Sequence, residues 1–326
     1  MIDVSVVIPT YNDAGTLDKC LQSILDQSYP ADQYEVVIVD GHSDDRTVAI
    51  AEEYDCRIFF EDKGTISFAR ELGMKKANGE YIAFTDADCV VGRDWLKKLR
   101  ATIDTDTDVA GVGGPNITPE DDSPLAKSVG DFFELFSKVG ARYGYSNDTT
   151  TEVEHNPTCN VFYRKKVIQE VGGFNEQLVT VDDEEMDYRI RQQGYKLLFR
   201  PDAVVEHYRR PTWRQFSSMA HSYGYGRGQA FRLHRELGRW FHFAPTITTV
   251  AILSLFVCTQ FTALPLAVPA LLLLSGEILV LGAAMRMRWQ SISNIGTNVG
   301  IINIWLGLWS VGFAKGLLDP PTPHDE

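Results

Sequence analysis

The sequence has little cysteine, and the spacing of the few that are present suggests no pairing. Five cysteines are scattered along 326 residues, and none of them forms a Cys-x-x-Cys pair. Neither a disulfide framework nor a structural zinc site is therefore expected. The chain starts with Met1-Ile2-Asp3 and a short apolar run that is broken by Pro9, which does not resemble a secretory signal. We expect the first two thirds of the chain to stay in a reducing cytosol.

The usual nucleotide-binding fingerprints are also missing. No Walker loop is present, and no G-x-G-x-x-G follows the first predicted strand. Gly224, Gly226 and Gly228 stand far downstream in a basic, aromatic stretch, which is not a dinucleotide fingerprint. The formal net charge of -13 argues against nucleic acid as a partner.

Only one segment of the chain carries a net positive charge. Residues 205–243 carry seven arginines against two glutamates, whereas residues 1–204 are strongly acidic. Residues 244–285 then contain no Lys or Arg and one acid, Glu277. As one helix these 42 residues would be about 63 Å long, roughly twice the hydrocarbon core of a bilayer. Two spans with a turn near Thr262 to Pro265 therefore fit better than one helix. A buried hairpin of a soluble protein fits less well, because a soluble core helix rarely runs this long without a charge.

A third apolar stretch, residues 295–314, is diluted by asparagine and glycine, so it either spans the bilayer or lies partly in its interface. The sequence thus predicts four segments. They are a cytosolic catalytic domain (1–204), a basic juxtamembrane segment (205–243), a membrane domain of two to three helices (244–318) and a polar tail (319–326). The expected location is the plasma membrane, with several spans and a cytoplasmic catalytic domain.

The first segment alternates β-branched runs with helical periodicity. Strands are predicted at residues 4–8, 36–39, 57–60 and 81–85, with helices between them. This spacing is typical of βαβ units, in which helices cover both faces of a parallel sheet. Ligands bind such sheets beyond the carboxyl ends of the strands. The polar residues that follow the strands, from Pro9 to Asn12, at Asp40, and at Asp86 and Asp88, should therefore converge on one crevice.

Carboxylates dominate the candidate chemistry of this crevice. Asp86 and Asp88 follow a buried strand and suit a hard divalent cation, Mg²⁺ or Mn²⁺, which would hold a diphosphate. His207 ends another short strand and is a candidate third ligand. Asp182 and Asp183 begin an acidic run before a helix, where one carboxylate could accept a proton from an attacking hydroxyl. Four acids in a row are also typical of a solvated helix face.

Together these motifs resemble the family 2 glycosyltransferases over residues 3 to about 210. The matching segments, in order, are Pro9 to Asn12, Asp40 to Thr47, Gly64 to Arg70, Asp86-Ala87-Asp88, and Asn160 through Gly172-Gly173-Phe174 to Asp183-x-Glu185-x-x-x-Arg189. The resemblance implies a GT-A fold, a mixed and mostly parallel sheet with helices on both faces, followed here by transmembrane helices. It also implies an inverting transfer from a nucleotide-sugar.

The resemblance implies a role for each matching residue. Asp40 would read the nucleotide base, beside Pro9, Tyr11 and Asn12, and Arg70 would approach the nucleotide together with Asp86. A metal ion would be held by Asp86, Asp88 and His207. Asp183 matches the catalytic base, and the usual Glu before it is Asp182 in this sequence. From the residues themselves, we expect an acceptor to meet Asp182, Arg209 and Arg210.

The basic segment and the apolar stretches behind it point to a lipid acceptor, since arginine suits phosphate and aromatic residues suit the membrane interface. The resemblance implies polyprenyl or dolichyl phosphate, or a lipid-linked oligosaccharide, as in archaeal N-glycosylation or cell-surface glycan assembly. The same arginines could bind only anionic head groups.

Three alternatives remain open from the sequence. A processive polysaccharide synthase of the same family would carry Gln-x-x-Arg-Trp, in place of which the chain has Glu236-Leu237-Gly238-Arg239-Trp240. A haloacid-dehalogenase-type phosphatase would use Asp86 as nucleophile, but would leave Asp40 unexplained. A membrane-tethered binder of nucleotide-sugars would bind them without turnover.

Overall fold

The computed structural model describes residues 2–140, 149–209, 212–262, 265–287 and 292–319. The chain divides into two compact units, which are described separately. The first comprises Met1–Asp121 and Ser137–Arg209, and the second comprises Asp122–Phe136 and Arg210–Glu326.

An eight-stranded sheet forms the centre of the first unit, in the order β3-β2-β1-β4-β9-β6-β10-β8. Neighbouring strands from β3 to β4 run parallel, as do β6 and β10, whereas β9 is antiparallel to both of its neighbours and β8 is antiparallel to β10. The strands are β1 (Val4–Thr10), β2 (Tyr34–Asp40), β3 (Arg57–Phe60), β4 (Tyr81–Phe84), β6 (Val109–Gly113), β8 (Thr151–Val153), β9 (Val161–Arg164) and β10 (Lys196–Phe199). The prediction of a mixed, mostly parallel sheet is confirmed.

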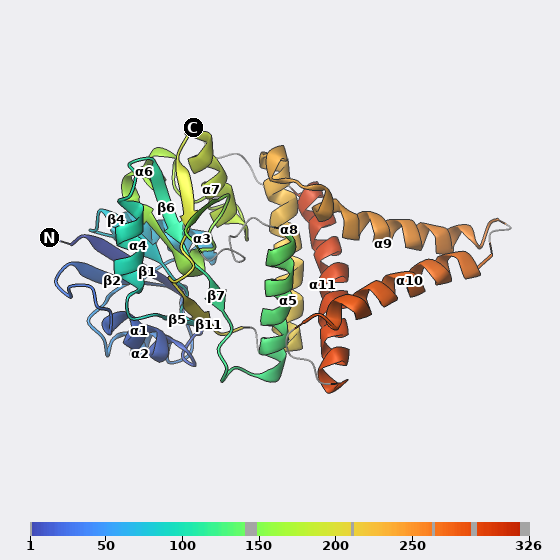
Figure 1. Ribbon diagram of the computed structural model, residues 1–326, viewed down its shortest axis with the longest axis horizontal. Helices are drawn as coiled ribbons and strands as arrows, with labels where there is room; N and C mark the ends of the chain where they lie inside the picture. Colours follow the sequence, from blue (N-terminus) through green and yellow to red (C-terminus); the bar gives the residue numbers. More distant parts are fainter. Residues whose placement is uncertain (1, 141–148, 210–211, 263–264, 288–291, 320–326) are drawn as a thin grey trace. The chain divides into compact units, whose positions relative to one another are not determined.

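Helices cover both faces of this sheet because successive side chains of each strand point to opposite faces. On one face Val6 and Ile8 pack with apolar residues of α1 and α4, and on the other Val7 and Val39 pack with α3, α6 and α7. Figure 1 shows these layers. The helices are α1 (Leu17–Leu25), α2 (Thr47–Ala51), α3 (Ile66–Lys76), α4 (Trp95–Ile103), α6 (Lys165–Glu170) and α7 (Asp182–Gln192), with a 3-10 turn η1 (Thr158–Asn160) before β9.

A second, three-stranded sheet adds residues from distant parts of the chain. Its order is β5-β11-β7, with bounds Cys89–Val91, Val205–His207 and Asn116–Ile117. β11 runs antiparallel to β5, which sets His207 opposite Cys89. The small sheet thereby brings a histidine from the end of the first unit next to the acidic motif that follows β4.

The second unit is helical. It contains α5 (Pro124–Gly140), α8 (Trp213–Leu233), η2 (Arg235–Leu237), α9 (Trp240–Cys258), α10 (Ala267–Ala284) and α11 (Ile292–Leu318). An apolar core joins α5, α8, α10 and α11, with Phe132, Phe216 and Trp305 among its aromatic members. α5, α8 and α11 lie side by side, and α9 and α10 extend away from them as a pair (Figure 1).

Two features of this unit differ from the segments expected from the sequence. α5 falls within residues 1–204, yet residues 122–136 group with the C-terminal helices, because Val129 and Phe132 find their apolar partners there. α9 begins at Trp240 rather than at residue 244. In the described chain three helices are long and apolar enough to cross a membrane, Trp240–Cys258, Ala267–Ala284 and Asn294–Leu318.

Glycines allow α8 and α11 to pack backbone against backbone. A Cβ atom on Gly224 would lie 2.1 Å from the carbonyl oxygen of Trp309, and one on Gly312 would lie 2.1 Å from that of His221. Real atoms do not approach this closely, so a side chain at either position would force the helices apart. Small residues four apart are a common device for such close helix pairs.

We expect Gly312→Ala to lower the free energy of unfolding in detergent by about 1–3 kcal/mol, and with it the melting temperature, because the added methyl group meets a backbone oxygen. Gly307 on the same helix has open space where a Cβ atom would lie. Gly307→Ala should therefore raise stability slightly, through its higher helix propensity, by about 0.5–1 kcal/mol. Equal melting temperatures for the two variants would contradict the close packing of α8 and α11.

Candidate active site

The loops that follow β1 and β2 bind each other through short polar side chains. Asp40, fully buried at the end of β2, accepts hydrogen bonds from the Thr10 hydroxyl (2.9 Å) and from the hydroxyl and backbone N–H of Ser43 (2.6 and 2.8 Å). Asn12 takes a positive φ of 58° and accepts a hydrogen bond from the Asp44 N–H (2.9 Å). Tyr11 stays 64% exposed beside them. The structure thus brings the predicted nucleotide-binding residues of the two strand ends together, and their role remains a prediction.

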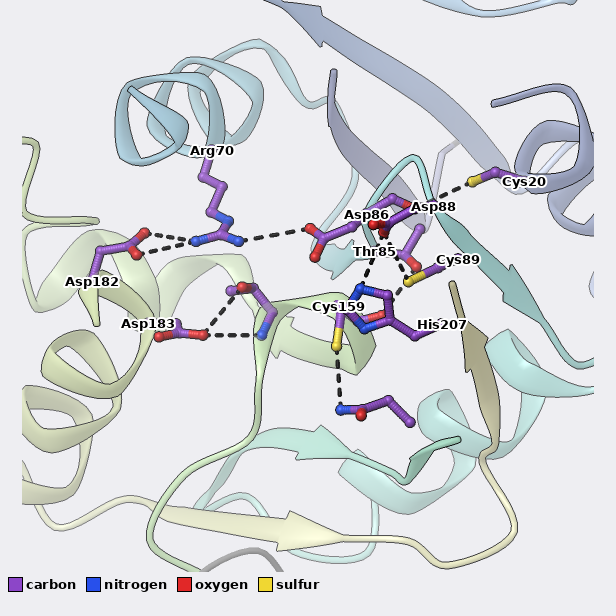
Figure 2. Close-up of polar contacts among 12 residues, drawn as sticks. Cys20, Arg70, Thr85, Asp86, Asp88, Cys89, Cys159, Asp182, Asp183 and His207 are labelled. Atoms are coloured by element: carbon purple, nitrogen blue, oxygen red, sulfur yellow. Dashed lines mark hydrogen bonds and ion pairs between the residues drawn. The ribbon is translucent and has the colours of Figure 1, made fainter. Parts of the chain in front are cut away.

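Arg70 lies at the centre of the candidate site. It projects from α3, and its side chain is only 7% exposed. Its Nη1 donates to both carboxylate oxygens of Asp182, at 3.1 and 2.9 Å, and its Nη2 lies 3.6 Å from Asp86 Oδ1. Figure 2 shows the guanidinium between these two carboxylates. Arg70 therefore joins α3 to the start of α7 and to the end of β4.

Two close contacts place α3 where Arg70 can make these bonds. A Cβ on Gly73, one turn after Arg70, would lie 2.3 Å from a methyl group of Val7, so this glycine lets α3 lie directly on β1. Glu71 accepts a hydrogen bond from the Phe174 N–H (3.0 Å), and Gly173 beside it has a positive φ of 74°. The Gly172-Gly173-Phe174 motif is thus a turn that seats against α3.

Asp88 and His207 come together as the sequence predicts, whereas the Asp86 carboxylate is paired with Arg70. His207 Nε2 lies 3.2 Å from Asp88 Oδ1, and ligand atoms of Asp88, Cys89 and His207 lie within 4.8 Å of one another. Burial raises the pKa of Asp86 to about 7, although Arg70 opposes this shift. Burial lowers the pKa of His207, but Asp88 outweighs it and the net result is a rise to about 9.

These residues fit a divalent cation. Asp86 Oδ1 is buried and has no hydrogen-bond partner among the described residues, apart from its ion pair with Arg70. Carboxylate oxygens suit Mg²⁺ and Mn²⁺, and an imidazole suits transition metals. A bound cation would offset the clustered negative charge of Asp86 and Asp88. Figure 2 shows Asp88 in contact with His207 and Asp86 turned toward Arg70, with the thiols of Cys89 and Cys159 nearby.

The acidic run at the start of α7 is not a solvated face. Asp182, Glu184 and Glu185 are at most 2% exposed. Glu185 accepts hydrogen bonds from Arg189 (2.8 and 2.7 Å), which also donates to the Gly173 carbonyl (2.6 Å). Glu185 and Arg189 therefore form a structural ion pair, and Arg189 fixes α7 to the turn before it.

Asp183 is more exposed than its neighbours in this run, since its side chain is 18% exposed against 2% for Asp182 and Glu185. Its Oδ2 accepts from the N–H and the hydroxyl of Thr158, each at 3.2 Å, and its Oδ1 accepts from the Glu184 N–H at 2.8 Å. Burial would raise the pKa of Asp183, but His155, Arg70 and these backbone N–H groups outweigh it and lower the pKa. Asp183 is therefore held as a carboxylate that still reaches solvent.

The residues predicted to meet an acceptor have other partners in the structure. Asp182 has a side chain only 2% exposed, and Arg70 binds both of its oxygens. Arg209 donates to the Asn116 side chain (2.6 Å) and to Thr118 (3.2 Å), and its Nη1 lies 2.9 Å from His207 Nδ1. Arg210 lies outside the described residues. Acceptor contact by these side chains stays a prediction, and the geometry of Asp182 favours a structural role.

Sequence reasoning missed two residues that contact Asp183. Thr158 belongs to no motif, although it stands two residues before Asn160 of the family pattern. His155 lies with its Nε2 3.9 Å from Asp183 Oδ2. A lone histidine in a loop gives no signal of its own, but its place just ahead of Thr158 and Asn160 could have marked it.

Comparison with known families identifies the chain. The profile described as "Glycosyl transferase family 2" matches residues 5–172. Glycosyltransferase AglE of Haloferax volcanii is 33% identical over 214 residues, which cover 64% of this chain and 67% of that protein. The chain belongs to glycosyltransferase family 2. The alternatives of a phosphatase and of a binder without activity are thereby set aside, and the chain is a glycosyltransferase.

Two further relatives of this glycosyltransferase carry informative descriptions. A Methanococcus voltae protein is described as a dolichyl N-acetyl-alpha-D-glucosaminyl phosphate 3-beta-D-2,3-diacetamido-2,3-dideoxy-beta-D-glucuronosyltransferase. It is 27% identical over 243 residues, 70% of this chain and 74% of that protein. Among solved structures, mannosyltransferase PcManGT from Pyrobaculum calidifontis, in complex with GDP-Man and Mn²⁺, has a TM-score of 0.65 at 22% identity. The structural match covers 97% of this chain and 87% of the PcManGT chain, and it confirms the GT-A-like fold.

We expect Arg70→Met to lower the free energy of unfolding by about 3–5 kcal/mol, because it leaves the buried carboxylate of Asp182 without its partner. Urea titration followed by tryptophan fluorescence measures this loss, and the double variant Arg70→Met/Asp182→Leu should recover part of it. Lys19→Met is the control, since the Lys19–Asp121 ion pair is exposed and its removal should leave the transition unchanged. An Arg70→Met transition equal to wild type would contradict the bridging role.

Proposed function

We propose that this glycosyltransferase moves a sugar, with inversion, from a nucleotide-sugar to a hydroxyl of a lipid-phosphate-linked acceptor. The acceptor class is polyprenyl or dolichyl phosphate, or an oligosaccharide linked to it. The reaction would serve the assembly of cell-surface glycans or of protein-linked N-glycans.

The state of Asp183 is the observation that carries the proposal. This carboxylate is ionised, oriented by three hydrogen bonds and still partly open to solvent. A general base needs these properties to accept a proton from an acceptor hydroxyl. The side chain of its neighbour Asp182 is only 2% exposed. The geometry therefore favours Asp183 over the other acids of the run as the base.

The donor would bind across the strand ends on the other side of Arg70. Asp40, with Tyr11 and Asn12, would contact the nucleotide, and Asp86, Asp88 and His207 would hold Mg²⁺ or Mn²⁺. When bound, the ion would neutralise charge on the diphosphate as it leaves. The PcManGT structure, a complex with GDP-Man and Mn²⁺, is consistent with this donor chemistry.

One displacement then accounts for the reaction. Asp183 takes the proton of the acceptor hydroxyl, the hydroxyl oxygen forms a bond to the anomeric carbon, and the bond from that carbon to the diphosphate oxygen breaks. A single attack from the face opposite the leaving group inverts the anomeric centre. The chain contributes mainly by positioning these groups and by stabilising charge.

Two observations support a lipid-linked acceptor. The Methanococcus voltae relative is described as acting on a dolichyl-phosphate-linked sugar. The described chain also has three helices of sufficient length and apolarity to cross a membrane, preceded by the arginines of residues 205–243. We propose a catalytic domain in the cytoplasm, a juxtamembrane segment over residues 205–243, and a membrane domain over 244–318 in the plasma membrane.

Of the three candidate spans, we propose that only α9 and α10 cross the bilayer. Their apolar side chains face outward, as Leu253 (58% exposed) and Leu271 (63%) illustrate. α11 packs along α5 and α8 instead, and α5 carries charged residues such as Lys127 and Asp131. Both ends of α5 lead directly into the first unit of the chain. We therefore place α11 in the membrane interface rather than across the bilayer.

A direct test offers labelled nucleotide-sugars to membranes that contain the protein and follows label into extracted lipid. Asp183→Asn should bind the donor normally and lose transfer by about 10²–10⁴-fold, since the amide cannot accept the proton. Asp106→Asn, an exposed aspartate paired with Lys196, is the matched control and should transfer normally. Near-normal transfer by Asp183→Asn would sink the assignment, and label in polymer rather than lipid would favour a processive synthase.

The two-span arrangement predicts the side on which the last helix ends. A reporter that fluoresces only in the cytoplasm should be bright when it is fused after Glu326, and equally bright at the N-terminus. The same reporter inserted after Thr262, between α9 and α10, should be dark. A dark C-terminal fusion would show that α11 crosses the bilayer.

A further inference from the structure

A buried histidine and a buried aspartate stand behind the proposed base. His155 precedes η1 and is 5% exposed, and Asp187 lies one helical turn after Asp183 on α7 and is fully buried. His155 Nδ1 lies 2.8 Å from Asp187 Oδ2. The same oxygen accepts from the Asn156 N–H at 3.0 Å, and the other accepts from the Tyr163 hydroxyl at 2.6 Å.

These three donors fix the orientation of the Asp187 carboxylate, and the bond to His155 in turn orients the imidazole. Because Asp187 accepts hydrogen bonds with both oxygens, its carboxylate form is the one that suits the site, and Nδ1 of His155 carries a proton toward it. The opposite ring nitrogen, Nε2, then faces Asp183 and lies 3.9 Å from its Oδ2. His155 thus lies between Asp187 and the proposed base, Asp183, with one ring nitrogen toward each.

The charges around the ring favour an imidazolium. Burial would lower the pKa of His155, but Asp183, Asp187 and Glu184, all on α7, outweigh it and raise the pKa above its ordinary value. Tyr163, on β9, contacts Asp187, and Arg70, on α3, is a second cation that acts on Asp183. An imidazolium faces a carboxylate that would otherwise be destabilised by its own burial.

We propose that His155 is a positioning residue for the base: clamped by Asp187, it holds Asp183 in place and keeps it ionised until the acceptor hydroxyl arrives. This inference rests on the proposed function, because it assigns to Asp183 the role of proton acceptor. The His155 side chain is only 6% exposed, so it would act through Asp183 rather than on the substrates themselves. Thr158 holds the same carboxylate oxygen from the backbone side.

Two substitutions distinguish the role of Nδ1, which bonds to Asp187, from that of Nε2, which faces Asp183. His155→Asn keeps an amide N–H near the position of Nδ1, where it can still donate to Asp187, and removes the cationic Nε2. His155→Gln keeps a neutral amide near the position of Nε2 and gives up the bond to Asp187. Both variants lack the positive charge that faces Asp183, and Asp106→Asn, which alters an exposed ion pair with Lys196, again serves as the control.

The expected readout is a pH profile of kcat for transfer to the lipid acceptor. In both His155 variants the acid limb should move to higher pH by about one unit, because a carboxylate without its cationic neighbour titrates at a higher pKa. Maximal kcat should fall by about ten-fold to a hundred-fold, as expected when a reacting group loses its fixed position. Binding of the nucleoside diphosphate with Mn²⁺ and the KM for the donor should stay unchanged, which a general folding defect would not allow.

A His155→Asn or His155→Gln enzyme with the wild-type acid limb and kcat would overturn the positioning role. Loss of nucleotide binding in both variants would overturn it as well, since His155 would then support the fold as a whole. The proposed function is tested separately by Asp183→Asn. If that variant is inactive while both His155 variants keep the wild-type profile, the base assignment stands and only the role of His155 fails.

Discussion

The buried guanidinium of Arg70 is the charge on which the geometry of the site depends. Removing an ion from water costs several kcal/mol, so a cation that is 7% exposed requires close anionic partners. Asp182 and Asp86 supply them from two different elements, the first residue of α7 and the end of β4. One side chain therefore fixes the helix that carries the proposed base against the strand end that carries the proposed metal ligands.

The acidic run at the start of α7 illustrates how a helix gives neighbouring residues different tasks. Successive side chains point about 100° apart around the axis, since a turn takes ~3.6 residues. Asp182 meets Arg70, Asp183 meets Thr158 and His155, and Glu185 meets Arg189. Asp183 alone of these three keeps appreciable contact with solvent. Three similar carboxylates thus separate into two structural anchors and one candidate base.

Much of the catalytic domain was predictable because its signals are local. Buried β-branched strands, helices at regular spacing and aspartates at strand ends indicated the mixed sheet and its crevice, and the solved relative confirms the fold. The place of α5 was not predictable, because an amphipathic helix does not specify which apolar partner it meets. Nor was the pairing of His155 with Asp187, whose 32-residue separation leaves no periodic trace. For the same reason, the sequence left open the alternative of a solvated face for the acidic run.

The sequence by itself determined the family, the order of strands and helices, the acidic motifs and the apolar helices, since these follow from residue type and spacing along the chain. Only the tertiary structure decided which carboxylate is buried, which one is exposed, and which cation each of them meets. The reason is that burial and ion pairing arise from contacts between distant segments. Asp182 and Asp183 are adjacent and chemically identical, yet Arg70 from one helix and Thr158 from another loop make them different groups.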